Sequence, residues 1–148
     1  MITPCKKYFK ELKSTNSYVL DNFNELKTGD VIIADVQTCG RGRFDRVWES
    51  NSSDNLYMTF VVKPANSDKF PYMNLTQYLS VVLNKIFNDK YGIKSDIKWP
   101  NDILFNGKKF VGILSEAKSE NGKIIGAALG IGININTDKD FYNDLPNA

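Results

Sequence analysis

Residues 98–116 read KWPNDILFNGKKFVGILSE, and this order of residues predicts a β-hairpin. The pair Pro100-Asn101 favours a tight turn, because proline fixes φ and asparagine tolerates turn conformations. An apolar strand follows at 103–105, and Asn106-Gly107 then gives a strong hairpin signal, since both central positions of that turn need a positive φ. We expect the return strand at 109–116.

The predicted hairpin carries an anion and a cation at defined places. Asp102 lies near one end of the first strand, and Lys109 lies just past the turn. A short hairpin can hold such a pair at a site without a long loop, so the pair is a candidate catalytic site. Most charges at strand ends are simply solvated, however, and the hairpin alone leaves both interpretations open.

A second candidate segment is the loop 37–48, QTCGRGRFDRVW, which holds three arginines with glycines between them. Glycine lets the backbone approach a ligand closely, and arginine brings bidentate donors for carboxylate and phosphate. The loop is therefore a candidate anion cradle, although a disordered basic loop or a nucleic-acid contact has the same composition. Its spacing is neither that of a Walker loop nor that of the dinucleotide fingerprint.

Two helices are predicted elsewhere in the chain. Ser14 or Thr15 can cap a short helix that continues to about residue 23. A longer helix is predicted where apolar residues recur at steps of three and four, and it ends before Gly92. The expected core face of this helix consists of Leu75, Tyr78, Leu79, Val82, Leu83, Ile86 and Phe87.

The remaining segments predict a sheet. Strands are expected at 8–12, 31–36, 56–62, 96–99, 103–105, 109–116 and 124–136. A second Asn-Gly turn at residues 121 and 122 joins the last two strands, so the last three form an antiparallel meander. Gly130 and Gly132 alternate in the final strand, where glycine lets another backbone come close. The predicted fold class is α+β, with a mixed, largely antiparallel β-sheet flanked by helices.

Composition narrows the range of functions. The 148 residues are 42% apolar and 24% charged, which is typical of one globular domain. A net charge of +2 argues against a protein built mainly to bind nucleic acid, and no apolar run is long enough to span a membrane. Two isolated cysteines and the lack of a signal-peptide pattern favour a cytoplasmic location. Histidine is absent, which removes histidine-based acid–base chemistry and the usual zinc sites.

An ordered set of motifs resembles the catalytic domain of biotin protein ligase. These motifs are Ser14-Thr15-Asn16, Gln37 before Gly40-Arg41-Gly42-Arg43 and Trp48, Asn55-Leu56-Tyr57, Lys98-Trp99-Pro100-Asn101-Asp102, Lys109, Gly112-Ile113-Leu114 with Glu116, and Gly130-Ile131-Gly132-Ile133-Asn134. The resemblance extends from about residue 8 to about residue 136, and its specificity comes from the order and spacing of the set. It implies a fold like that of class II aminoacyl-tRNA synthetases and biotin synthetase.

The resemblance implies a two-step ligation with biotin and ATP as substrates and Mg²⁺ as the accompanying ion. Biotin would first attack the α-phosphate of ATP to give biotinyl-5′-AMP. A specific lysine of a biotin carboxyl carrier protein domain, the implied partner, would then take the biotinyl group. The first step joins two anions, so cations must offset their repulsion. Asp102 is expected to orient the acceptor amine or to take its proton.

The resemblance also implies the roles of individual residues. The expected catalytic residues are Lys109, Arg41 and Asp102. The expected biotin-binding residues are Ser14, Thr15, Asn16, Gln37, Gly40, Arg41, Lys109, Gly112 and Gly130. The expected ATP- and adenylate-binding residues are Arg43, Arg46, Trp48, Lys98, Asn101, Gly132 and Asn134. No metal held by the protein is expected, because phosphate and water oxygens would bind most of the Mg²⁺. The arginine loop is expected to order when ligand arrives.

Two departures from the family pattern bear on these expectations. Asp45 stands where the family loop commonly has glycine, and it can pair with Arg43 or Arg46, which leaves the strength of loop closure open. The chain ends at Ala148, within the family pattern. We therefore expect residues 1–148 to form a biotin ligase catalytic domain that is incomplete at the C-terminus. We expect neither an N-terminal helix-turn-helix domain nor a C-terminal β domain.

Other functions remain open at this point. A lipoate or octanoate ligase-type acyltransferase would share the architecture, although the tryptophan-bearing arginine loop and the block 98–102 favour biotin. A non-catalytic biotin- or adenylate-binding fragment is the second alternative. Nucleic acid and membranes are not expected as partners. The family resemblance adds a homodimer formed through sheet edges as an expectation.

Overall fold

The computed structural model describes residues 4–44, 46–50 and 54–136. Its elements are β1 (Lys6–Leu12), α1 (Thr15–Asp21), the 3-10 helix η1 (Phe23–Glu25), β2 (Val31–Gln37), β3 (Leu56–Val62), the 3-10 helix η2 (Tyr72–Asn74), α2 (Leu75–Tyr91), β4 (Ser95–Lys98), β5 (Asp102–Phe105), β6 (Lys108–Glu120) and β7 (Lys123–Ile133). Asp45 and the C-terminal residue Ala148, which the sequence analysis discussed, lie outside these described residues. The predicted fold class is confirmed.

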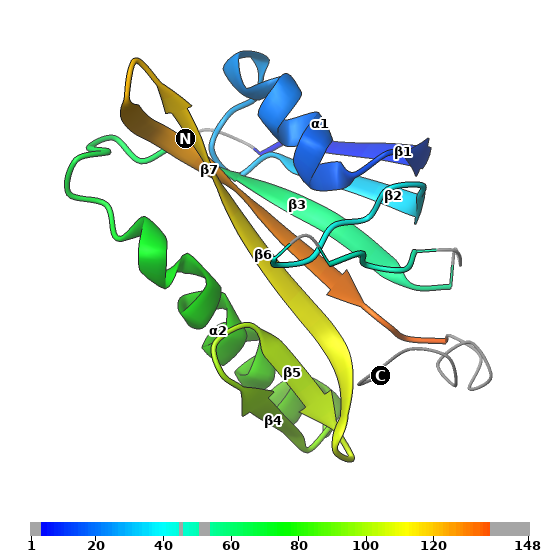
Figure 1. Cartoon of the computed structure of the whole chain (residues 1–148). Helices are drawn as coiled ribbons and strands as arrows, with labels where there is room; N and C mark the ends of the chain where they lie inside the picture. Colours follow the sequence, from blue (N-terminus) through cyan, green and yellow to red (C-terminus); the bar gives the residue numbers. More distant parts are fainter. Residues whose placement is uncertain (1–3, 45, 51–53, 137–148) are drawn as a thin grey trace.

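The seven strands form one sheet in the order β1-β2-β3-β7-β6-β5-β4 (Figure 1). Within the described residues, β1 and β2 run parallel and the other neighbouring strands run antiparallel. The predicted meander is present, because Asn106-Gly107 joins β5 to β6 and Asn121-Gly122 joins β6 to β7. All four turn residues have φ between 49° and 76°. The long strands β6 and β7 cross the middle of the sheet.

Helix α2 packs its apolar residues against one face of the sheet. Leu83 and Phe87 belong to a buried cluster with Ile103, Val111, Ile113, Leu129, Ile131 and Ile133. The expected core face of this helix was too wide, since Tyr78 is 73% exposed and Val82 is 46% exposed. The residues that face the sheet recur every four positions. Tyr78 and Val82 each precede one of them, which rotates their side chains away from the sheet.

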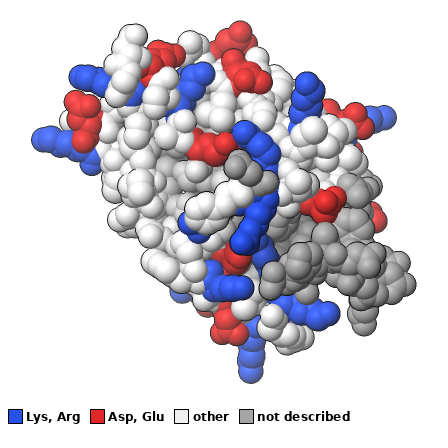
Figure 2. Space-filling view, in the orientation of Figure 1, with Lys and Arg blue, Asp and Glu red and all other residues white. Residues whose placement is uncertain are grey.

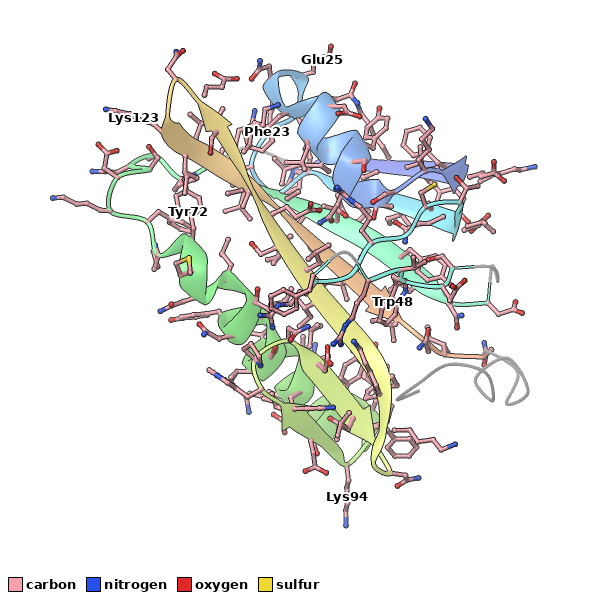
Figure 3. All side chains as sticks on the ribbon, in the orientation of Figure 1. Phe23, Glu25, Trp48, Tyr72, Lys94 and Lys123 are labelled. Carbon is pink, nitrogen blue, oxygen red and sulfur yellow. The ribbon has the colours of Figure 1, made fainter. Side chains whose placement is uncertain are left out.

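Helix α1 covers the opposite face of the sheet. Val19 and Phe23 lie in a second buried cluster with Val61 of β3, and Figure 3 labels Phe23 beside α1. The neighbouring residues Phe60 and Val62 pack instead against the cluster of α2. Because successive side chains of a strand point to opposite faces, the two helices lie on opposite sides of the sheet. Because α1 is short, it covers only part of this sheet face, and the loop that follows β2 lies over another part.

Candidate active site

Three glycines lie together on the sheet face opposite α2, and we call them the glycine floor. Gly112 of β6 pairs directly with Gly132 of β7, and Gly130 lies two residues earlier in β7. A methyl group on Gly112 or Gly132 would lie closer than 3.0 Å to the Trp48 indole, and one on Gly130 would meet the Asn16 amide. A close approach at Gly130 and Gly132 is therefore present, but the approaching groups are two side chains and not the backbone that the sequence analysis expected.

A β-bulge in β6 brings Lys109 to this face. Ile103 pairs with Val111, but Leu104 pairs with Lys109, so Phe110 is an extra residue in β6. Phe110 and Val111 both pack toward the cluster of α2, although neighbours in a regular strand point to opposite faces. The extra residue places Lys109 on the same face as the glycine floor.

Lys109 and Asp102, the two charges that the hairpin pattern singled out, form an ion pair. The Lys109 Nζ lies 2.8 Å from Asp102 Oδ1, and both side chains are less than one-third exposed. Asn101 Nδ2 donates to the same carboxylate oxygen at 2.9 Å. The Lys109 ammonium also lies 5.1 Å from the centre of the Trp48 ring. One cation is thus held between a carboxylate and an indole beside the floor.

The N-terminus of α1 forms a polar wall of the pocket with β2. Ser14 is the N-cap, and its Oγ accepts a hydrogen bond from Ser17 N. The Thr15 N–H and hydroxyl both donate to Gln37 Oε1, at 2.8 and 3.1 Å. Gln37 Nε2 donates to Ser50 Oγ at 3.1 Å. These buried groups fix hydroxyls and amides at one end of the pocket.

Asn16 links the same polar wall to strands β3 and β6 through hydrogen bonds. Its Oδ1 accepts a hydrogen bond from Thr59 Oγ1 at 2.6 Å. Its Nδ2 donates to Glu116 Oε2 at 2.8 Å and to the Leu114 carbonyl at 3.3 Å. Both ends of the Asn16 amide therefore have protein partners, and the side chain is held against Gly130.

The described part of the arginine loop, residues 37–44 and 46–48, folds back on itself above the glycine floor. Trp48 N donates to Gly40 O at 3.0 Å, and Gly42 N donates to Arg46 O at 2.7 Å. A methyl group on Gly40 would overlap the Trp48 carbonyl, so this closure requires glycine there. The described arms of the loop therefore form a narrow hairpin. Its ordering by ligand stays a prediction.

Two arginines anchor the loop to the body of the protein. Arg41 Nη2 lies 2.9 Å from Glu116 Oε2, and Arg43 Nη1 donates to Asn101 Oδ1 at 2.9 Å. Basic side chains run across the middle of this face in the space-filling view (Figure 2). The Trp48 side chain extends from the loop to the central strands (Figure 3). Its buried Nε1 has no hydrogen-bond partner among the described residues.

The pocket collects most of the residues predicted from sequence. Those that line it are Ser14, Thr15, Asn16, Gln37, Arg41, Arg43, Trp48, Asn101, Lys109, Gly112, Gly130 and Gly132. Five predicted residues lie outside the described lining, namely Gly40, Arg46, Lys98, Asp102 and Asn134. The pocket thus joins a hydroxyl- and amide-rich wall to a cationic end across the glycine floor.

The five residues outside the lining have other positions near it. Asp102 contacts the pocket through Lys109, and Lys98 lies opposite Asp102 in the neighbouring strand β4. Asn134 donates its N–H to the carbonyl of Phe110 in the bulge. Gly40 and Arg46 supply backbone carbonyls that close the arginine loop.

Sequence reasoning missed three residues that support the pocket. Thr59 is fully buried in β3, and Ser50 is 1% exposed at the base of the arginine loop. Glu116 was part of the quoted motifs, but it was not assigned to the site. A polar residue in the middle of the apolar strand 56–62 was a usable signal for Thr59, whereas the partners of Ser50 and Glu116 are set only by tertiary structure.

The fold and the pocket define a class of protein: an α+β domain with a pocket between a glycine floor and an arginine loop, whose cationic side chains suit an anionic ligand. The described residues hold no group of three or more Cys, Asp or Glu side chains placed to bind a metal ion. No described helix is long and apolar enough to cross a membrane.

Comparisons with known proteins identify the family. The model of the biotin/lipoate A/B protein ligase family matches residues 8–134, and the chain belongs to this family. The bifunctional ligase/repressor BirA of Bacillus spizizenii is 41% identical over 122 residues, which cover 82% of this chain and 37% of BirA. The chain therefore spans less than half the length of this curated relative.

Solved structures agree with this assignment. The biotin protein ligase of Aquifex aeolicus, in complex with biotin and ATP, has a TM-score of 0.74 at 29% identity, with 96% of this chain and 55% of that chain covered. The Leishmania major biotin protein ligase, in complex with biotinyl-5-AMP, has a TM-score of 0.70 at 28% identity, with 92% and 58% covered. The predicted resemblance to biotin protein ligases is confirmed.

Proposed function

We propose that this chain activates biotin with Mg-ATP and passes the biotinyl group to a lysine of a biotin carboxyl carrier protein domain. The observation that carries the proposal is the position of Lys109, which a β-bulge holds beside the glycine floor, facing the polar wall. The two solved structures named above are biotin protein ligases, one with biotin and ATP and one with biotinyl-5-AMP.

The polar wall is proposed to hold the ureido ring of biotin. Ser14, Thr15 and Gln37 present hydroxyl and amide groups there, and these groups are already oriented by one another. A buried polar ring needs matched partners, because each unpaired polar group costs roughly 1–3 kcal/mol. A ring that lacks the ureido oxygen and nitrogens, such as the dithiolane of lipoate, could not use the remaining hydrogen-bonding capacity of these groups.

The first step is proposed to occur beside Lys109. A carboxylate oxygen of biotin attacks the α-phosphorus of ATP, and the bond from that phosphorus to the departing pyrophosphate breaks. Lys109 and Arg43 would offset the repulsion between the two anions and bind charge that develops at phosphorus. Asp102 would orient the Lys109 ammonium, to which it is already paired. Mg²⁺ would enter with ATP as part of the substrate.

The adenylate is proposed to lie along the glycine floor toward Trp48. The unpaired Nε1 of Trp48 is a donor available to a ligand acceptor, and Asn101 and Arg43 line the same end. Glycine at positions 112 and 132 leaves the backbone bare beneath the indole. A flat aromatic ligand could take the place of this indole over the glycines, or it could stack on the indole. Neither arrangement would displace a side chain of the sheet.

The second step requires a neutral acceptor amine. The amine nitrogen attacks the acyl carbon of the adenylate, the bond to the AMP oxygen breaks, and an amide and AMP result. A free lysine has a pKa of about 10.4, so its proton must leave before or during attack. Asp102 is our proposed group for orienting that amine or accepting its proton. With isolated biotinyl-5′-AMP as the substrate, Asp102→Asn should slow transfer. An unchanged transfer rate would remove Asp102 from this step.

Biotin-dependent release of pyrophosphate from Mg-ATP tests the proposal. The described chain should release pyrophosphate, and Lys109→Ala should lower the rate by roughly 100- to 1,000-fold, as loss of one transition-state donor does elsewhere. Lys108→Ala is the matched control, because Lys108 is the preceding residue of β6 and is exposed. Biotin binding without pyrophosphate release would favour the non-catalytic binding function instead.

The setting of the reaction is also part of the proposal. Cys5 and Cys39 are both free and exposed, which suits the reducing cytoplasm. The terminal strands of the sheet, β1 and β4, offer the edges through which two copies could pair. Sedimentation of the purified chain with and without biotin measures that pairing.

A further inference from the structure

Glu116 joins two parts of the pocket through one oxygen atom. Its Oε2 accepts from Arg41 Nη2 at 2.9 Å and from Asn16 Nδ2 at 2.8 Å. Arg41 belongs to the arginine loop, Asn16 belongs to α1, and Glu116 itself belongs to β6. Glu116 does not line the described pocket, so the proposed chemistry leaves this carboxylate without a role.

The contact with Asn16 makes Glu116 a rigid anchor. Asn16 is 3% exposed, and Thr59 and the Leu114 carbonyl hold its amide from two other directions. The Glu116 side chain is 25% exposed, and that of Arg41 is 43% exposed. A freely moving surface pair contributes little, but here the carboxylate is held in place before the guanidinium meets it.

We propose that Glu116 is a positioning residue that holds the arginine loop closed over the glycine floor before biotin binds. The inference rests on the proposed function, because it assigns Glu116 to preparing the biotin site. A loop that is already closed loses less conformational freedom when ligand binds. Loss of the Glu116 carboxylate would therefore weaken biotin binding without removing a ligand contact.

Hydrogen exchange in the absence of ligand gives the first test. In Glu116→Ala and Glu116→Gln, the amides of Gly42 and Trp48 should exchange at least tenfold faster, because the loop opens more often. Glu120→Ala is the matched control, since Glu120 lies on the same strand and is exposed. Glu116→Gln retains the shape of the side chain and decides the question if the alanine variant does not fold. Unchanged exchange in a folded Glu116→Gln variant would overturn the proposal.

A double-mutant cycle on biotin affinity gives the second test. Glu116→Gln should raise the biotin Kd at least fivefold in the wild-type background and less than twofold in an Arg41→Met background, because the pair is already broken there. An equal effect in both backgrounds would overturn the proposal. If the wild-type chain does not bind biotin, the proposed function fails, and the exchange experiment still decides the role of Glu116.

Discussion

The two faces of strand β7 place opposite demands on neighbouring residues. Leu129, Ile131 and Ile133 point toward α2 and are at most 7% exposed. Gly130 and Gly132 alternate with them and face the pocket. On one face, side-chain volume stabilises the fold. On the other face, the absence of side-chain volume makes room for Asn16, Trp48 and a ligand. Stability and function are thus separated by one residue along the strand.

The largest expected effect tests the face toward α2. Leu129→Ala should lower the free energy of unfolding by about 2–5 kcal/mol, because it leaves a cavity in the buried cluster. Biotin affinity of the folded fraction should stay unchanged. Urea denaturation and calorimetry measure the two quantities. Ile124→Ala, at a 39% exposed position of the same strand, is the control. A loss of affinity in folded Leu129→Ala would break the separation between the faces.

The next effect tests the glycine floor. In Gly132→Ala the new methyl group would lie 2.5 Å from the Trp48 ring, and overpacking of this kind costs about 1–3 kcal/mol. We expect the strain to displace Trp48, and pyrophosphate release to fall at least tenfold. Combining the change with Trp48→Phe should restore part of the rate, because the smaller ring leaves more room. Full activity of Gly132→Ala would show that the pocket does not require glycine at position 132.

A smaller effect tests the hydrogen bonds on the pocket face. Thr59→Val keeps the shape of the side chain but removes the hydroxyl that donates to Asn16. We expect the free energy of unfolding to fall by about 1 kcal/mol and biotin affinity to fall with it. Met58→Leu changes the neighbouring residue, which faces α2, and should leave affinity unchanged. Equal affinities for Thr59→Val and wild type would make the Thr59 bond purely structural.

The smallest effect concerns a charge that lies on neither face. Burial opposes ionisation of Asp30, but hydrogen bonds from the N–H groups of Cys5 and Lys27 outweigh it and hold the pKa of Asp30 below its ordinary value. Its contribution to stability is therefore complete above the unfolded pKa of about 3.9 and is lost as pH falls through the native pKa.

Asp30→Asn should consequently lower the free energy of unfolding at neutral pH by at most about 1 kcal/mol. The difference from wild type should shrink below about pH 4. Urea denaturation from pH 7 to pH 3 measures this difference, and biotin affinity at pH 7 should not change. A difference that is constant with pH would mean that the charge of Asp30 is not the stabilising feature.

The sequence predicted the elements that local chemistry controls. The two Asn-Gly turns, the Ser14 cap and the glycine at the end of α2 each depend on the conformation of a few residues. Periodicity placed the strands, but it overestimated the core face of α2, because it cannot show how much of a helix the sheet covers. The exposed Tyr78 is the clearest example.

The site residues that belong to sequence motifs could be predicted. The contacts that join residues far apart in the sequence could not. The hairpin motif singled out Lys109 and Asp102, whereas the ion pair between them became visible only in the structure. The shared oxygen of Glu116 joins residues 16, 41 and 116, and no local pattern relates such distant positions. The extra residue Phe110 is likewise defined by the register between β5 and β6, and this register cannot be read from the sequence.

The bulge at Phe110 lets a lysine enter a polar pocket from a position that an alternating pattern would assign to the core. With regular alternation counted back from Gly112, Lys109 would face the apolar layer under α2, and the extra residue Phe110 turns it toward the pocket instead. Position 110 can therefore accept another apolar side chain far more readily than a polar one, because its side chain packs against that layer. The spacing between Lys109 and Gly112 thus matters as much as the identity of the residues between them.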